Sequence, residues 1–192
     1  FSYKGEEFAI SLAGVYQKEN AVLALNALEE LDRLGWTTTM EQRKEGLLHT
    51  SWKGRFTVIN KKPLFIVDGA HNAGAADKMA ESIRHYFNGK KLIYIMGVFA
   101  DKEYKIVLEK TAHFAEKIYT IETPDNPRAL PAEELAKAAR VYNSSAESTK
   151  SIKDAVEKAF SCAGDDENSV ILAFGSLSFI GALTDAVEEY VG

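Results

Sequence analysis

The stretch Phe65-Ile66-Val67-Asp68-Gly69-Ala70-His71-Asn72 decides the fold of this chain. Its apolar residues end abruptly at Asp68-Gly69, which predicts a buried strand followed by a turn. Behind it, apolar residues recur at helical spacing from Ala76 to Phe87, and Asn88-Gly89 is a typical helix C-terminus. An aspartate, a histidine and a carboxamide therefore meet at a strand-to-helix switch, where open α/β sheets bind ligands. Asp68 and Asn72 are equally typical helix caps, so a purely structural role for them stays open.

Along the rest of the chain, short apolar runs alternate with helical patterns. Strands are predicted over 56–59, 64–67, 92–96, 117–121 and 170–174, with a weak one at 145–147. Helices are predicted between them, with Tyr86, Tyr142 and Tyr190 among the residues that face inward. Five strand–helix alternations predict an α/β fold with a mostly parallel sheet and helices on both faces.

The first fifty residues depart from this alternation. Residues 8–12 resemble a strand, helices are predicted over 17–34 and 40–48, and residues 51–55 are interpreted as a hinge. The helix over 17–34 is apolar around a wide arc. We therefore expect the segment before Gly35 to be poorly buried unless it finds a partner, and its surface to be covered either by self-association or by folding back onto the following domain.

Composition narrows the function classes. The 192 residues carry a net charge of -5, which argues against nucleic-acid binding because that needs a concentrated basic face. The single cysteine, Cys162, excludes an internal disulfide and a cysteine-based zinc site. No apolar run reaches membrane-spanning length and no secretory signal opens the chain, so we expect a cytoplasmic protein. The first residue is Phe1 rather than Met, and we expect the chain to be part of a longer one.

Polar and glycine residues gather where the predicted strands end. They include Asp68, His71, Lys102, Arg128 and the run Gly175-Ser176-Leu177-Ser178. The carboxyl ends of parallel strands share one edge, and free backbone N–H groups at the last run suit a carboxylate or phosphate. Neither the P-loop pattern nor a G-x-G-x-x-G pattern occurs, and no spacing suggests a metal site.

A set of motifs adds a family resemblance. In order they are Leu12-Ala13-Gly14-Val15-Tyr16-Gln17-Lys18-Glu19-Asn20-Ala21, Gly46-Leu47, Trp52-Lys53-Gly54-Arg55, Val67-Asp68-Gly69-Ala70-His71-Asn72, Gly97 with Asp101-Lys102, Thr123-Pro124 with Pro127-Arg128-Ala129-Leu130, and Gly175-Ser176-Leu177. Together they closely resemble the folylpolyglutamate synthase/dihydrofolate synthase family, the folate branch of the Mur ligase superfamily.

This resemblance implies a two-part chain taken from a longer enzyme. Residues 1–52 would be the tail of a central ATP-binding domain, and residues 53–192 a Rossmann-like C-terminal ligase domain. The activity implied is ATP-dependent addition of L-glutamate to folate or dihydropteroate through an acyl phosphate. ATP and Mg²⁺ are the implied cofactors, with the P-loop, the metal ligands and most of the folate site in an upstream ATPase domain. We therefore expect this chain alone to be inactive.

The resemblance also assigns roles to five residues. Asn20 resembles the carboxamide that reads the adenine of ATP, Arg55 the arginine that reaches its phosphates, and Asp68 the aspartate that binds its ribose. His71 and Ser176 resemble the pair that lines the phosphate and incoming-glutamate side, and they are the candidate catalytic residues.

Three departures and two alternatives accompany this interpretation. Tyr16 replaces the usual histidine, while Lys53 and Ala73 each replace a proline, and the role of position 16 is open.

The first alternative is the C-terminal domain of a peptidoglycan Mur ligase, because residues 125–128 resemble a diaminopimelate-binding segment. The second alternative is a nucleotide-binding module without catalysis.

Overall fold

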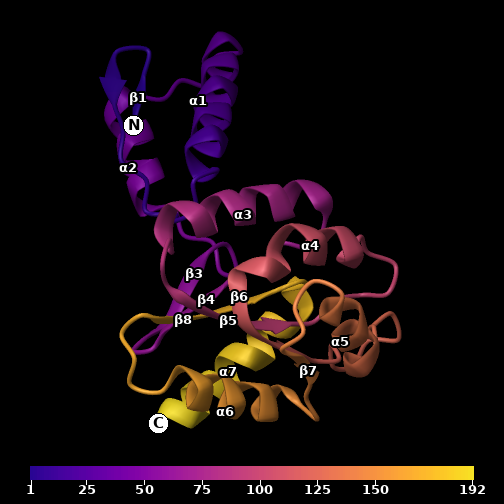
Figure 1. The fold of residues 1–192 in the computed structure, drawn as a ribbon. Coiled ribbons are helices and arrows are strands. Elements are labelled where there is room, and N and C mark those ends of the chain that lie inside the picture. Colours follow the sequence, from indigo (N-terminus) through magenta and orange to yellow (C-terminus); the bar gives the residue numbers. More distant parts are fainter.

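The computed structural model describes residues 1–192 and has a six-stranded sheet at its centre (Figure 1). The strands are β3 (Thr57–Lys61), β4 (Leu64–Val67), β5 (Lys91–Met96), β6 (Ala115–Thr120), β7 (Ala146–Ser148) and β8 (Ser169–Phe174). Their order is β3-β4-β8-β5-β6-β7, and every neighbouring pair is parallel except the antiparallel pair β3–β4. The predicted, mostly parallel sheet is confirmed.

Helices cover both faces of this sheet, as predicted. One face is covered by α3 (Ala73–Tyr86), α4 (Tyr104–Thr111) and α5 (Ala132–Arg140), and the other by α6 (Ile152–Ala163) and α7 (Ile180–Val191). Two short 3₁₀ turns, Ala112–Phe114 and Leu177–Phe179, lead into β6 and α7. Alternate strand residues enter the two cores: Ile66 packs with α3 and its neighbours, whereas Phe65 packs with α6 and α7. None of the helices combines the length and the apolar composition that a membrane-spanning helix requires.

The N-terminal segment, residues 1–52, stands away from the sheet (Figure 1). It holds the hairpin β1 (Ser2–Tyr3) and β2 (Glu6–Glu7), followed by α1 (Gln17–Arg33) and α2 (Met40–His49). Leu25 of α1 is only 1% exposed, whereas Leu23 on the same helix is 69% exposed. Only a narrow stripe of α1 finds partners within the chain, so the apolar surface of α1 is not covered by folding back onto the following domain, and its cover by self-association stays a prediction.

Four further expectations about packing are wrong. Residues 8–12 form no strand, because the preceding residues turn back as a hairpin closed by Phe8 N–H donating to Phe1 O at 2.9 Å. Tyr86, Tyr142 and Tyr190 are exposed rather than inward-facing. They lie in the last turns of α3 and α7 and just beyond α5, where a tyrosine can leave its polar end in water.

Gly175 shows why glycine is required where β8 ends. Its φ is +118°, and a Cβ there would lie 2.5 Å from the carbonyl oxygen of Gly97 at the end of β5. The two neighbouring strands therefore approach each other at backbone distance just where their loops leave the sheet.

We expect Gly175→Ala to destabilise the protein by about 2–4 kcal/mol, since it adds both backbone strain and a clash with main chain. Gly181→Ala in α7 is the matched control: its Cβ would meet no atom within 4 Å, and alanine is the better helix former by about 0.5–1 kcal/mol. Urea unfolding of both variants checks this. A Gly175→Ala variant as stable as the parent would contradict the expected clash.

Candidate active site

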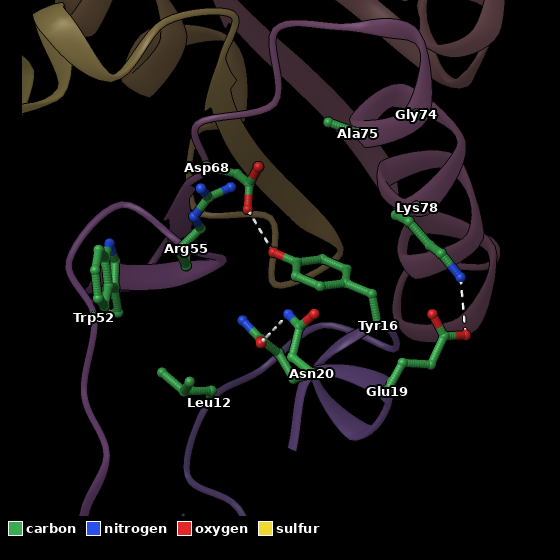
Figure 2. A pocket seen from close by; sticks show the side chains of 11 residues that line it. Leu12, Tyr16, Glu19, Asn20, Trp52, Arg55, Asp68, Gly74, Ala75 and Lys78 are labelled. Atoms are coloured by element: carbon green, nitrogen blue, oxygen red, sulfur yellow. Dashed lines mark hydrogen bonds and ion pairs between the residues drawn. The ribbon is translucent and has the colours of Figure 1, made fainter. Parts of the chain in front are cut away.

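A cavity of about 510 Å³ lies where the N-terminal segment meets the sheet domain. Figure 2 shows side chains from three parts of the chain around it. They are Leu12, Tyr16, Gln17, Glu19 and Asn20 from the N-terminal segment, Trp52 and Arg55 from the hinge, and Asp68, Gly74, Ala75 and Lys78 from the sheet domain. The structure thus brings together Asn20, Arg55 and Asp68, which the sequence singled out, in one cavity that we call the hinge cavity.

Asp68 follows β4 directly and is held by three donors of the chain itself. Its Oδ1 accepts from Ala70 N–H at 2.8 Å, and its Oδ2 accepts from Phe56 N–H at 2.9 Å and from the Tyr16 hydroxyl at 3.0 Å. Asp68 is only 3% exposed, and this burial raises its pKa above the ordinary value despite the three hydrogen bonds. Asp68 therefore organises the hinge around Phe56 as well as lining the cavity. Asn72, by contrast, is the true cap of α3 and accepts from Ala75 N–H.

The Tyr16 hydroxyl crosses from the N-terminal segment to Asp68 and donates to its Oδ2 (Figure 2). Burial and the neighbouring carboxylate raise its pKa, so the phenol stays protonated and donates at neutral pH. A second link between the same two parts is the ion pair between Lys78 Nζ of α3 and Glu19 Oε1 of α1, at 2.9 Å. Tyr16 and Lys78 thus fix the two walls of the hinge cavity relative to each other.

Arg55 is the cation of the hinge cavity. Its guanidinium is half-buried and forms no ion pair, whereas most arginines of the chain are paired with a carboxylate. Its positive charge lowers the pKa of both Asp68 and Tyr16, although burial outweighs this effect at each of them. A half-buried, unpaired guanidinium that faces a cavity is suited to bind a phosphate or carboxylate.

A second cavity, of about 420 Å³, opens at the carboxyl edge of the sheet. Its lining consists of His71, Phe99, Lys102, Gly175, Ser176, Leu177 and Ser178. We call it the edge cavity. It contains both predicted catalytic residues, His71 and Ser176, so the five site residues predicted from the sequence fall into two groups.

Local hydrogen bonds set the chemistry of the edge cavity. His71 Nδ1 lies 2.7 Å from the carbonyl oxygen of Gly69, so Nδ1 carries the proton and Nε2 is left as an acceptor. The hydroxyl oxygens of Ser176 and Ser178 are 2.7 Å apart, and Ser178 N–H donates to Ser176 Oγ at 3.3 Å. With the Lys102 ammonium on the same wall, the cavity offers a cation, hydroxyls and one imidazole acceptor.

Leu177 connects the edge cavity to the hinge. Its side chain packs on the backbone of two glycines, such that a Cβ on Gly69 would lie 2.5 Å and one on Gly54 2.9 Å from Leu177 Cδ2. Gly69 N–H also donates to Gly54 O at 2.9 Å. The loop carrying Ser176 is therefore packed directly on the turn that carries Arg55.

Sequence reasoning assigned no role to Gln17, Lys78 or Leu177. The signal for Gln17 was present, since it lies three residues before Asn20 and shares its helix face. Lys78 and Leu177 act through contacts between distant parts of the chain, which no local pattern reveals. Within residues 1–192, no three His, Cys, Asp or Glu side chains are grouped so that they could hold a metal ion.

Comparison with known proteins gives a consistent result. The chain is 29% identical over 186 residues to the dihydrofolate synthase/folylpolyglutamate synthase of Bacillus subtilis, a match that covers 94% of this chain and 42% of the relative. Folylpolyglutamate synthase from Thermotoga maritima matches at 27% identity and a TM-score of 0.74, over 95% of this chain and 41% of that one.

The fold likeness extends to Mycobacterium tuberculosis folylpolyglutamate synthase complexed with ADP and AMPPCP, at a TM-score of 0.81 and 24% identity, over 97% of this chain and 42% of that one. The chain thus spans less than half the length of these relatives. The family model for the Mur ligase glutamate ligase domain matches residues 54–177, which is most of the chain. The chain therefore belongs to the Mur ligase family and contains its glutamate ligase domain.

Proposed function

We propose that this chain is the C-terminal part of an ATP-dependent ligase that adds L-glutamate to folate or dihydropteroate through an acyl phosphate. Residues 53–192 are the ligase domain in this proposal, and residues 1–52 complete a central ATP-binding domain that precedes it. Support comes from the glutamate ligase domain model and from relatives at 27–29% identity that are folylpolyglutamate or dihydrofolate synthases.

One observation carries the proposal: an unpaired arginine lines the hinge cavity on a turn that packs against the wall of the edge cavity. Arg55 lines the hinge cavity, and its turn packs through Gly54 on Leu177, which lines the edge cavity. A nucleotide in the hinge cavity would direct its phosphates toward Arg55 and the boundary with the edge cavity. Phosphoryl transfer depends mostly on positioning and charge stabilisation, which this arrangement can supply in part.

Each predicted site residue has a role in this scheme. Asn20 hydrogen-bonds the adenine, Asp68 accepts a hydrogen bond from a ribose hydroxyl, and Arg55 binds the phosphates. In the edge cavity, Lys102 pairs with a carboxylate of the incoming glutamate and Ser176 donates to the acyl phosphate. His71 Nε2 takes the proton that the amine loses as its nitrogen bonds the acyl carbon and phosphate leaves.

Mg²⁺ is part of the same proposal, but residues 1–192 are not proposed to bind it. No three His, Cys, Asp or Glu side chains of residues 1–192 are grouped around a possible metal ion, so no step is assigned to a metal held by these residues alone. In this proposal the preceding domain would hold a divalent ion, which would neutralise charge on the phosphates.

The structure favours the folate branch over a peptidoglycan Mur ligase. Arg128 lies in the segment that suggested the alternative, yet its Nη2 bonds Asp101 Oδ2 at 2.5 Å and its guanidinium lies 4.8 Å from the centre of the Phe99 ring. Its charge is thus already paired with a carboxylate of the chain, at the protein surface. A non-catalytic nucleotide-binding module would not need the His71, Lys102 and Ser176 group of the edge cavity.

The test is turnover with defined substrates. The longer protein that contains this chain is incubated with ATP, Mg²⁺, glutamate and either dihydropteroate or tetrahydrofolate, and phosphate release is measured. We expect release that depends on glutamate and on one or both acceptors, and none above background from residues 1–192 alone, because this chain lacks a phosphate cradle. No release from the longer protein with either acceptor would contradict the proposed activity, and release from residues 1–192 alone that is lost in Arg55→Ala would show that the active site is misplaced.

A further inference from the structure

The N-terminal segment and the sheet domain are joined by few polar contacts besides the turn that connects them. These are Val15 N–H to Ser82 Oγ at 3.3 Å, Lys78 Nζ to Glu19 Oε1 at 2.9 Å, and the Tyr16 hydroxyl to Asp68 Oδ2 at 3.0 Å. The first bond is long and the second pair is exposed, so both are weak. Tyr16 donates to a buried carboxylate, and a hydrogen bond to a charged group is worth about a ten- to hundred-fold change in an equilibrium constant. Tyr16 is therefore the main polar tie between the two parts.

Asp68 has little acceptor capacity left for a ligand. Its Oδ2 already accepts from Phe56 N–H and from the Tyr16 hydroxyl, and its Oδ1 accepts from Ala70 N–H. A carboxylate oxygen accepts about two hydrogen bonds, so Oδ2 is fully used and Oδ1 retains one position. The two N–H donors are main-chain groups close to Asp68 along the strand and the hinge, and they cannot leave without rearranging the backbone. The Tyr16 hydroxyl comes from the other part of the chain and is the one donor that can be exchanged.

The Tyr16 hydroxyl thus occupies the position that a ligand hydroxyl needs. Tyr16 and Asp68 both line the hinge cavity, and in Figure 2 the tyrosine reaches across to the carboxylate. We propose that Tyr16 is an internal competitor for Asp68, which a nucleotide ribose must displace, so that nucleotide binding releases the N-terminal segment from the sheet domain. The inference rests on the proposed binding of ATP in the hinge cavity and adds a device that couples this binding to movement between the two parts.

The variant Tyr16→Phe isolates the hydroxyl. The ring lies against Gly14, where a Cβ would come within 2.9 Å of Tyr16 Cε1, and phenylalanine keeps this packing. The matched control is Tyr3→Phe. The Tyr3 hydroxyl donates to Asn26 Oδ1 at 2.6 Å inside the N-terminal segment, and Tyr3 does not line the hinge cavity. The control therefore removes a phenol hydroxyl that joins no other part of the chain.

Dissociation constants are measured by NMR titration of the parent chain and both variants with ATP and with 2′,3′-dideoxy-ATP, and circular dichroism verifies folding. We expect Tyr16→Phe to bind ATP about three- to ten-fold more tightly than the parent and the Tyr3→Phe control, because the ribose no longer has to displace a hydrogen bond. Dideoxy-ATP has no ribose hydroxyl with which to compete. It should therefore bind the parent and Tyr16→Phe equally.

Release of the N-terminal segment is measured as a distance between two spin labels by pulsed electron paramagnetic resonance. The labels are placed at Glu41→Cys on α2 and Lys137→Cys on α5, in a Cys162→Ala background, because Glu41 and Lys137 are exposed and lie outside the cavities. We expect ATP to change the distance distribution of the parent and dideoxy-ATP to leave it unchanged. Tyr16→Phe should show a broader distribution than the parent without nucleotide. The measurement on the parent decides the matter if Tyr16→Phe does not fold.

The results that would overturn the inference are distinguishable. If Tyr16→Phe binds ATP as weakly as the parent or more weakly, the hydroxyl does not compete with the ribose, while ATP binding by the parent still agrees with the proposed function. A distance distribution of the parent that ATP leaves unchanged would contradict the release of the segment. If neither nucleotide binds the parent or Tyr16→Phe, the inference fails together with the nucleotide site proposed for the hinge cavity.

Discussion

Replacing Arg55 by alanine in the ligase proposed above should lower kcat/KM by about 10²–10³-fold, the largest effect that we expect from any single side chain of this domain. Arg55 is half-buried, forms no ion pair and faces the hinge cavity. Its removal takes away the one cation there that is free to stabilise charge developing on transferred phosphate. Stability should change little, because no hydrogen bond of its side chain is lost.

Steady-state kinetics of three variants check this result. Arg55→Lys should recover part of the loss, since it restores the charge without the planar fork that binds two phosphate oxygens. Lys53→Ala, an exposed neighbour on the same turn, is the matched control and should keep the parent rate. An Arg55→Ala enzyme with an unchanged rate would show that the phosphates lie elsewhere.

Asp68→Ala should destabilise the protein by about 2–5 kcal/mol as well as weaken nucleotide binding. It leaves the N–H groups of Phe56 and Ala70 without their acceptor in a buried site, and each such donor costs about 1–3 kcal/mol. Phe56 also holds a left-handed φ of 49°, a conformation supported by the hydrogen bond that its N–H donates to Asp68. Urea unfolding measures the loss, and an unchanged midpoint with weakened ATP binding would show that Asp68 serves the ligand alone.

The Asp68→Asn variant separates charge from hydrogen bonding. Because burial raises the folded-state pKa of Asp68 above that of the unfolded chain, the folded protein binds more protons between the two pKa values. The stability that Asp68 contributes is thus highest below about pH 4, its unfolded pKa, and falls as the pH rises through the folded pKa. Asparagine cannot titrate, so the stability difference between parent and variant should shift in the variant's favour from pH 4 to pH 7. A pH-independent difference would contradict the raised pKa.

The sequence predicted most of the fold because the local pattern of apolar residues in each strand and helix agrees with the secondary structure that the segment adopts. Strand β4 occupies Leu64–Val67 as predicted, and the ends of the helices fall within a few residues of the predicted ends. What local pattern could not give was the antiparallel direction of β3, which depends on a hairpin partner. The sequence indicated that α1 would be poorly buried without a partner, but the apolar pattern of a helix face does not show which segment, if any, packs against it.

The site was predicted in its parts rather than in its geometry. Strand ends and the family resemblance selected Asp68, His71 and Ser176. They did not predict the hydrogen bond between Asp68 and Tyr16, which lies 52 residues earlier in the chain. The division into two cavities also arises only in three dimensions, where Leu177 packs on the turn before Arg55. The roles of the five predicted residues stay predictions until the variants are measured.

The position of β8 has a consequence for how the chain acquires its structure during synthesis. The last strand to be made lies in the middle of the sheet, with β4 on one side and β5 on the other. Until residue 174 has left the ribosome, the earlier strands form two separate blocks whose inner edges are unpaired, and such edges promote aggregation. Contacts of this long range also slow folding. The nascent domain is thus prone to aggregation through most of its translation. Its core closes late, when β8 pairs with β4 on one side and β5 on the other.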